Sequence, residues 1–422
     1  MDIPPAGTSF SPSQEIGRTA ALHADDVVRN LPPPENKKFY PALDGLRAMA
    51  VLMVFYQHYL SIGGVRPAMN WGWTGVDIFF VLSGFLITGI LYDTRDTLHR
   101  FRTFYIRRTL RIFPLYYGVL LVALLLYPVF HWVWHPVWIL WPLYLGNFGR
   151  FIWLNDWMQG TGVLDHFRAG PPYHDVFFQI GHFWSLCVEE QFYLVWPLMV
   201  FMIRDRVRIR NLCLVVCGVC LAARIACVFF VPPDYIDAEL LYRLTPLRAD
   251  ALLLGGALAL ALRGPEAAWL HRFRHHALTL FAVGFVMFEI IYRLVNQHLY
   301  APVAGAPVLD TIGYTLIDIF AAALILVVLH PGGILFRVFT LRPLRRLGQV
   351  SYGFYVFHDI PHIAYVKLAQ HIARHLPFPG VTLGGVTACI ALPATLALSF
   401  LSFRYFESPF LRLKERFAAA PR

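Results

Sequence analysis

Charged residues are scarce in this sequence. Lys, Arg, Asp and Glu make up only 15% of its 422 residues, whereas a soluble domain is nearer a quarter charged. Hydrophobic residues make up 57%, and the mean hydropathy is +0.54. This composition excludes an ordinary soluble domain. Repeated apolar runs of about 20 residues instead predict an all-α, polytopic integral membrane helical bundle.

Cysteine is also sparse, and five of the six Cys lie inside or beside apolar runs, so no disulfide framework is expected. Cys213, Cys217 and Cys220 follow a C-x3-C-x2-C pattern, which also occurs at iron–sulfur sites. They share one face of an uninterrupted apolar helix, so we expect small buried side chains. Without an H-E-x-x-H motif or paired metal-ligand spacing, the sequence predicts no metal site.

Positive charge exceeds negative charge, and the formal net charge is +10. The Arg residues gather in short clusters between apolar runs. This is the positive-inside pattern of membrane proteins rather than a nucleic-acid-binding surface, so no nucleic-acid partner is expected. Four clusters are expected on the cytoplasmic side: Arg95–Arg111, Arg204–Arg210, Arg263–Arg274 and Arg337–Arg346.

About ten transmembrane helices are expected. Their ranges are 43–62, 72–92, 112–130, 184–203, 210–231, 249–262, 277–295, 309–330, 349–370 and 381–403. If all the Arg clusters share one side, the Trp- and Pro-rich stretch His131–Leu145 must lie at the outer interface or re-enter. Both termini are then cytoplasmic. Residues 1–38 are expected to be a disordered cytoplasmic tail, 39–412 the membrane domain and 413–422 a short cytoplasmic tail.

The first expected span carries three residues that a membrane helix normally avoids. Asp44 and Arg47 precede His58 by fourteen and eleven positions, so on a helix they lie within about 40° of it, along one stripe. Ionisable groups inside a span are costly, and a functional role is the default hypothesis. The alternative is that Asp44 and Arg47 pair at the interface while His58 is a packed core histidine.

Four titratable residues are expected at one depth near the outer face: His58, Asp77, Glu189 and Glu190. At 1.5 Å per residue, each lies roughly 8–11 Å below the outer surface. A histidine with carboxylates at the same depth can act as a general base with an orienting partner. The alternative is a structural polar network that ties the helices together.

Arginines form a second layer at the cytoplasmic ends of the first and third spans. Arg108 and Arg111 share a helix face, and Arg47 is expected near them. Guanidinium groups suit phosphates, although ordinary positive-inside charge is the alternative. His358 is expected between the two layers, about nine residues into its span. A hydrogen-bonded core histidine and a role in chemistry are both open for it.

Six segments appear in an order that resembles the acyltransferase type 3 family, bacterial membrane enzymes that decorate cell-surface glycans. They are YPALDGLRAMAVLMVFYQHY, GVDIFFVLSGFLIT, FYIRRTLRIFPLYY, FWSLCVEEQFYLVWP, SYGFYVFHDIP and the closing FRYFESPF. The resemblance covers about 39–412, and it implies a cytoplasmic acyl-coenzyme A donor and an acceptor on the far side.

The resemblance also implies roles for single residues. Arg47 and His58 match the family's basic-x10-His pair, Arg108 and Arg111 match its donor-associated RxxR motif, and Glu189 matches its acidic position after Ser-Leu-x-Val. No domain of the SGNH hydrolase type is expected after the last expected span, so we expect that a second transfer step would need a partner. Cys187 stands where the family commonly has a small residue, and a thiol in apolar surroundings is expected to be inert.

The sequence therefore predicts an O-acyltransferase of the bacterial inner membrane. It would move an acyl group, with acetyl the expected one, from acyl-CoA to a hydroxyl of a glycan or lipid-linked saccharide. His58 would be the general base, oriented by Asp77 or Glu189. Three alternatives are a multispan transporter of a glycolipid or small solute, a sensor that binds acyl-CoA without turnover, and a membrane acyltransferase of another family.

Overall fold

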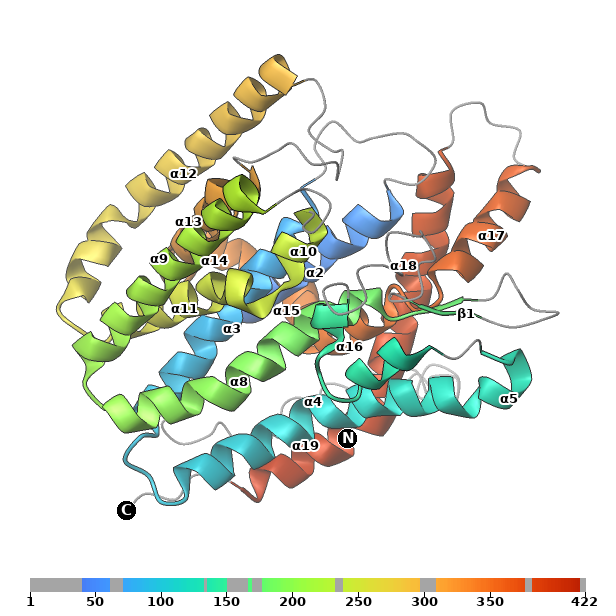
Figure 1. The fold of residues 1–422 in the computed structure, drawn as a ribbon, viewed down its shortest axis with the longest axis horizontal. Helices are drawn as coiled ribbons and strands as arrows, with labels where there is room; N and C mark the ends of the chain where they lie inside the picture. Colours follow the sequence, from blue (N-terminus) through green and yellow to red (C-terminus); the bar gives the residue numbers. More distant parts are fainter. Residues whose placement is uncertain are drawn as a thin grey trace, which may run out of the picture. The chain divides into compact units, whose positions relative to one another are not determined.

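The structure is a computed structural model that describes residues 40–60, 71–132, 135–149, 166–168, 177–231, 238–296, 309–375 and 382–417. The tail expected at 1–38 lies outside these residues. Within the unit Pro41–Arg422, the regular secondary structure of the described residues is helical except for one short antiparallel pair of strands, β1 (His166–Arg168) and β2 (Phe177–Gln179). The expected helical class is confirmed (Figure 1).

The α-helices are α2 (Pro41–Tyr59), α3 (Thr74–Asp93), α4 (Arg100–Leu125), α5 (Tyr127–Phe130), α8 (Trp184–Ile203), α9 (Arg206–Phe230), α10 (Ala238–Arg243), α11 (Thr245–Ala261), α12 (Glu266–Asn296), α13 (Tyr314–Val328), α14 (Ile334–Phe339), α15 (Arg342–Gln349), α16 (Ser351–Phe357), α17 (His362–Ala373), α18 (Leu383–Ser402) and α19 (Ser408–Glu415). The shorter helical turns are η1 (Pro136–Leu140), η2 (Gly146–Phe148), η3 (Gly181–Phe183), η4 (Leu309–Gly313) and η5 (Phe403–Glu407).

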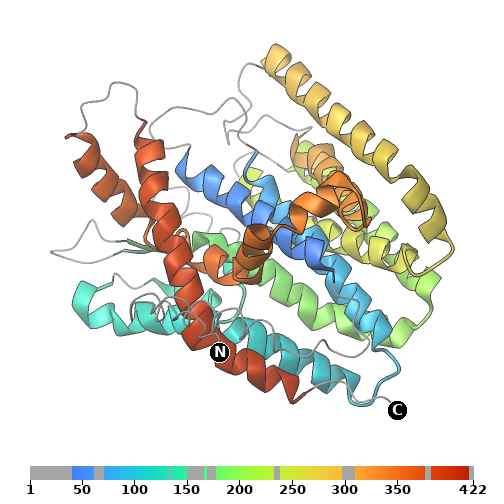
Figure 2. The same cartoon turned by 180° about the vertical axis from the view of Figure 1, so that it is seen from behind.

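Six stretches of the described residues are long and apolar enough to cross a membrane, so at least six of the expected spans have helices of the required kind. They are Thr74–Asp93, Arg100–Phe130, Gly181–Ile203, Arg206–Phe230, Asp310–Val328 and Leu383–Lys414. In the view from behind, the last of these runs as α18 into α19, which lies beside α4 (Figure 2).

The centre of the bundle is built on close packing between α3 and α11. A Cβ atom added to Gly84 would lie 1.7 Å from the carbonyl oxygen of Leu252, and one added to Gly255 would lie 1.9 Å from that of Val81. Glycine at these positions lets the two helix backbones touch, as small residues do in membrane proteins. Most of α3 is therefore buried inside the bundle, including Asp77 on its first turn.

The helices α4 and α8 run antiparallel. Phe101 near the start of α4 packs on Phe201 near the end of α8, with ring centroids 4.8 Å apart. At the other end, Tyr116 packs on Phe183 at 5.1 Å. The segment between α4 and α8 therefore leaves and returns at the same end of this pair. Part of it is held against α4, because the Tyr116 hydroxyl donates a 2.7 Å hydrogen bond to the Trp141 carbonyl.

Three of the four Arg clusters meet at the opposite end of the bundle. Arg263 pairs with Asp93 at the end of α3 at 2.6 Å, and Arg206 pairs with Glu266 at the start of α12 at 2.9 Å. The hydrogen bonds from Arg206 lower the pKa of Glu266. Arg100 lies over an aromatic ring of α8. This is the end that we expect to face the cytoplasm.

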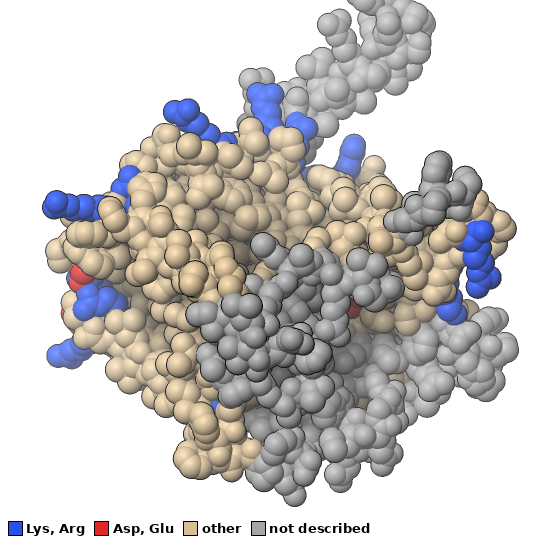
Figure 3. Space-filling view, turned by 90° about the horizontal axis from the view of Figure 1, so that it is seen from above, with Lys and Arg blue, Asp and Glu red and all other residues tan. Residues whose placement is uncertain are grey.

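The molecular surface carries little charge over most of one face. In Figure 3 the Lys and Arg side chains lie around the edge of the view, and uncharged residues cover most of the described surface between them. This arrangement suits a protein whose sides contact lipid.

The expected helix at 349–370 is interrupted, which corrects the predicted continuous span. α16 ends at Phe357, and α17 begins only at His362. Pro361 explains the break, because its ring has no N–H for a helical hydrogen bond and clashes with the carbonyl four residues earlier. That carbonyl belongs to Phe357, the last residue of α16. The break lies against the end of α2, where His58 is found.

Candidate active site

His58 lies on the last turn of α2, and its hydrogen-bond partner is His358. The Nδ1 atom of His58 is 2.8 Å from Nε2 of His358, and the stacked rings have centroids 4.9 Å apart. His358 is fully buried, whereas His58 is partly exposed. The structure thus brings together two histidines that the sequence assigned to different depths.

The break after α16 supplies acceptors for two histidine side chains. In a continuous helix, the Tyr355 and Val356 carbonyls would bond to backbone N–H groups four residues later. Because α16 ends, the Tyr355 carbonyl lies 2.6 Å from Nδ1 of His358, and the Val356 carbonyl lies 3.0 Å from Nε2 of His182. Helix-end carbonyls that would lack partners are satisfied in this way.

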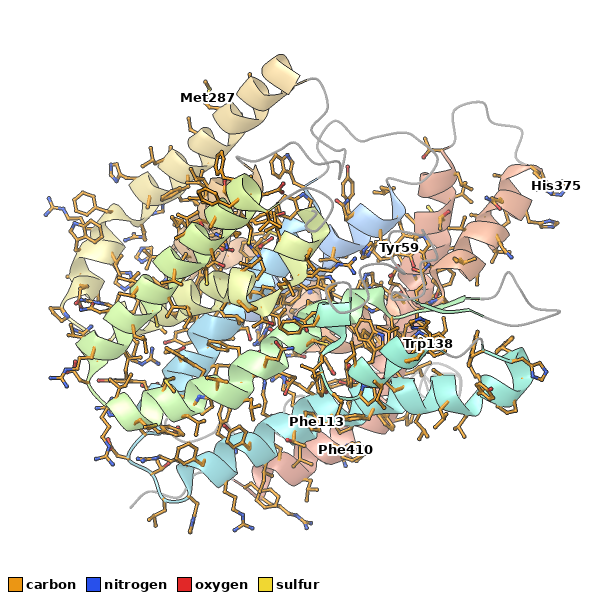
Figure 4. The ribbon with its side chains drawn as sticks, in the orientation of Figure 1. Tyr59, Phe113, Trp138, Met287, His375 and Phe410 are labelled. Carbon is orange, nitrogen blue, oxygen red and sulfur yellow. The ribbon has the colours of Figure 1, made fainter. Side chains whose placement is uncertain are left out.

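Asp359 joins two further histidines to this site. One carboxylate oxygen lies 3.5 Å from Nδ1 of His182, and the other lies 3.3 Å from Nδ1 of His362. The Tyr59 hydroxyl donates to the carbonyl of His358, which fixes the backbone at the break. Figure 4 labels Tyr59 at the end of α2. We call His58, His182, His358, Asp359 and His362 the histidine cluster.

Three members of the histidine cluster were not among the residues predicted from the sequence. His182 directly precedes the FWSLCVEEQ segment, and Asp359 and His362 stand on either side of Pro361. A spacing of three residues between Asp359 and His362 beside a helix-breaking proline was a usable signal. The approach of His182 depends on η3, which lies buried inside the bundle. Nothing in the local sequence indicates that position.

Asp77 does not lie beside His58 as its orienting partner. It pairs with the fully buried Arg248 of α11 and accepts a 3.2 Å hydrogen bond from the Tyr242 hydroxyl. Arg248 also lies 3.8 Å from Asp318 of α13. This buried network joins α3, α11 and α13, so the structural alternative describes the contacts of Asp77 better than the orienting role does.

Glu189 and Glu190 also lie away from His58. Glu189 hydrogen-bonds to Ser83 and Tyr193, and both carboxylates interact electrostatically with Arg108. Their contacts differ from the grouping with His58 that was expected. The buried turn η3 precedes α8, and Glu189 and Glu190 lie on the second turn of α8, further along the chain toward Arg108.

The three arginines predicted to bind the donor lie close together, and we call them and the carboxylates around them the arginine layer. Arg111 interacts with Arg47 and Arg108, and Arg47 pairs with Asp44 at 2.9 Å. Arg108 lies over the Tyr193 ring at 3.8 Å. The layer also contains four carboxylates, which interact with these arginines: Asp44, Glu189, Glu190 and Glu407. The arginine layer is therefore a mixed site in which guanidinium groups are held by carboxylates.

Arg47 and Arg111 are the members of the arginine layer whose surroundings suit phosphate groups. Both side chains are only partly exposed, and their charges are close enough to repel each other. A bound polyanion would relieve that repulsion.

Among the described residues of the chain, no group of three or more His, Cys, Asp or Glu side chains is arranged to hold a metal ion.

The fold and these two layers define a polytopic membrane protein in which one helix, α2, carries arginine and histidine sites at different depths. The sequence profile of a family described as an acyltransferase domain matches residues 40–404. The chain therefore belongs to the acyltransferase type 3 family, as its motifs predicted.

Curated relatives carry related names. The chain is 30% identical over 384 residues to the peptidoglycan O-acetyltransferase OatA of Listeria monocytogenes, covering 89% of this chain and 56% of that protein. It is 32% identical over 398 residues to the putative peptidoglycan O-acetyltransferase YrhL of Bacillus subtilis, covering 89% and 55%. For the O-acetyltransferase OatA of Staphylococcus aureus, the identity is 26% over 388 residues, covering 88% and 57%. The chain thus spans just over half the length of these relatives. No solved structure matches it.

Proposed function

We propose that this protein is a membrane O-acetyltransferase that modifies a hydroxyl of a cell-wall glycan. Its donor is acetyl-CoA from the cytoplasm, and its acceptor is peptidoglycan or a lipid-linked saccharide precursor on the outer side of a bacterial inner membrane. Both termini lie in the cytoplasm. The family and the names of the relatives support the reaction class and the acceptor.

One observation carries the assignment of residues. Arg47 and His58 lie on a single helix, α2, and are separated by about 16 Å of helical rise. Arg47 belongs to the arginine layer, and His58 is hydrogen-bonded within the histidine cluster. A donor held by its phosphates at the lower site can present a thioester to the upper site at the end of an extended arm.

In the proposed reaction, His58 takes the proton from the acceptor hydroxyl as its oxygen attacks the thioester carbonyl. The C–S bond then breaks, the thiolate of coenzyme A leaves with the electron pair, and the new ester stays on the glycan. Arg47 and Arg111 hold the donor phosphates. Arg108 contributes through its contacts with Glu189 and Glu190, which hold this part of the layer together.

Oriented vesicles that contain the purified protein test the proposal. Acetyl-CoA is supplied on the side that exposes Arg208, and a muropeptide or lipid-linked disaccharide is supplied on the other side. We expect transfer across the bilayer. We also expect His58→Ala to lose about 10²–10⁴ in rate, the usual worth of a general base. The matched control is His275→Ala, an exposed histidine of α12 that should keep full activity.

Two results would count against the proposal. Product formed only when donor and acceptor share the Arg208 side would exclude transfer across the membrane. Full activity of His58→Ala would remove this histidine from the reaction. Movement of the saccharide across the vesicle membrane without acetyl-CoA would instead favour a transporter.

A further inference from the structure

The hydrogen bonds around His358 determine which nitrogen of His58 can act as a base. Nδ1 of His358 lies 2.6 Å from the backbone carbonyl of Tyr355. A carbonyl oxygen can only accept a hydrogen bond, so Nδ1 of His358 must carry a proton and donate it. The state of the other nitrogen, Nε2, then decides how His358 meets His58.

Burial keeps His358 neutral. Its side chain has 0% exposure, and a second proton would place a charge in the interior. The adjacent carboxylate of Asp359 is already shared by His182 at 3.5 Å and His362 at 3.3 Å. Nε2 of His358 is therefore unprotonated, and its lone pair faces His58.

The tautomer of His58 follows from this contact. Nδ1 of His58 lies 2.8 Å from the lone pair on Nε2 of His358, so it must be the donor of that hydrogen bond. In neutral His58 the remaining nitrogen, Nε2, then has no proton. It is the nitrogen that can accept a proton from a hydroxyl group.

The surroundings hold this chain of hydrogen bonds in place. The hydroxyl of Tyr59 donates to the carbonyl of His358, and the hydroxyl of Tyr355 donates to the carbonyl of His182 at 2.8 Å. The side chain of Ser185 lies 2.5 Å from the same Tyr355 hydroxyl. The backbone is thus fixed at His358, which is hydrogen-bonded to His58, and at His182, whose ring packs on that of His358 with centroids 4.9 Å apart.

We propose that His358 is a positioning residue that holds His58 in one tautomer, with the proton on Nδ1 and the basic lone pair on Nε2. This inference rests on the proposed function, because it assigns a task to the histidine that we take as the base. It replaces Asp77 and Glu189 as orienting groups. The helix break at Pro361 is part of the device, since it frees the Tyr355 carbonyl that anchors His358.

Nitrogen-15 NMR of histidine-labelled protein in vesicles tests the tautomer without any reaction. The His58 signals are those that disappear in His58→Ala. We expect a protonated Nδ1 and an unprotonated Nε2 for His58 in the wild type. His358→Phe should lose this single state, whereas His358→Gln should keep it, because its side-chain oxygen takes the place of Nε2. A wild-type His58 with its proton on Nε2 would overturn the proposal.

Kinetics provide the second test. His358→Phe should lower kcat by up to the about 10²–10⁴ that a general base contributes, with KM for donor and acceptor unchanged. His358→Gln should restore most of the rate. In a His58→Ala background, His358→Phe should cause no further loss, because it acts only through His58.

The outcomes separate the inference from the proposed function. If His58→Ala is inactive but His358→Phe keeps the wild-type kcat, the role of His58 as the base is supported and the positioning role of His358 is excluded. An equal loss of kcat in His358→Phe and His358→Gln would also exclude the positioning role. That role requires Gln to restore the rate, because the Gln side-chain oxygen can accept the hydrogen bond from His58 and Phe cannot. If His58→Ala is fully active, the proposed base fails, and the NMR spectrum still decides the tautomer.

Discussion

Arg108 and Arg111 lie three positions apart on α4, yet their surroundings differ. Arg108 lies over the Tyr193 ring and interacts with Glu189 and Glu190. Arg111 lies mainly among other arginines and near Asp44. The RxxR spacing predicts that both residues lie on one face of the helix. It does not show which of the two arginines interacts with carboxylates from another helix. Their neighbours on α8 decide that.

We therefore expect Arg108→Ala and Arg111→Ala to have different effects. Arg111→Ala should weaken coenzyme A binding by about 10–100-fold, which corresponds to the loss of one charge-assisted hydrogen bond of about 1.5–3 kcal/mol. Arg111→Lys should recover only part of this affinity, because an ammonium group cannot bind a phosphate in bidentate fashion. Calorimetry in detergent measures both. Unchanged affinity in Arg111→Ala would exclude it from the donor site.

Arg108→Ala should lower the thermal stability as well as the affinity, because it removes the cation that Glu189 and Glu190 share and leaves Glu189 with only the weaker interaction with Arg47. Glu190→Gln in the same chain should restore the stability but not the full affinity. If Glu190→Gln restores neither, the contact with Glu190 does not explain the loss.

At the scale of elements, the packing of α3 on α11 depends on glycine. Gly84→Ala would place a methyl group on the Leu252 carbonyl, and such overpacking typically costs about 1–3 kcal/mol. Gly218 of α9 has no atom within 4 Å of an added Cβ, so Gly218→Ala is the matched control. We expect a lower apparent unfolding temperature only for Gly84→Ala. Tryptophan fluorescence recorded during heating measures this midpoint. Equal midpoints would contradict this packing.

The sequence predicts helices well where a long apolar run decides them. It also places Arg47 and His58 on one helix, because helical periodicity is local. It fails where depth depends on contacts from other parts of the chain. η3 begins α8 inside the bundle, so Glu189 lies with Arg108 rather than with His58. Asp77 was assigned as a partner of the base from its expected depth alone, because its buried partner, Arg248, lies 171 positions away in the sequence and could not be foreseen.

At the scale of the whole molecule, the antiparallel course of α4 and α8 bears on topology. We expect His131 and Arg208 to lie on opposite sides of the membrane, because they belong to opposite ends of this pair. Cysteine introduced at each exposed position, in a chain whose native Cys389 is replaced by Ser, should react with an impermeant maleimide from opposite faces of a vesicle. Labelling of both from one face would contradict the ten-span arrangement.

The unbroken course of α2 from the arginine layer to the histidine cluster has a further consequence. Because Arg47 and His58 lie on one helix, the distance between them along that helix is fixed and does not depend on the donor that is bound. If the charged end of the donor is held near Arg47 and His58 is the base, as proposed, only a carrier whose arm reaches about 16 Å brings its acyl group to His58. We therefore expect donors to be selected by the length of the carrier, with the chemical reactivity of the thioester deciding only among donors that are long enough.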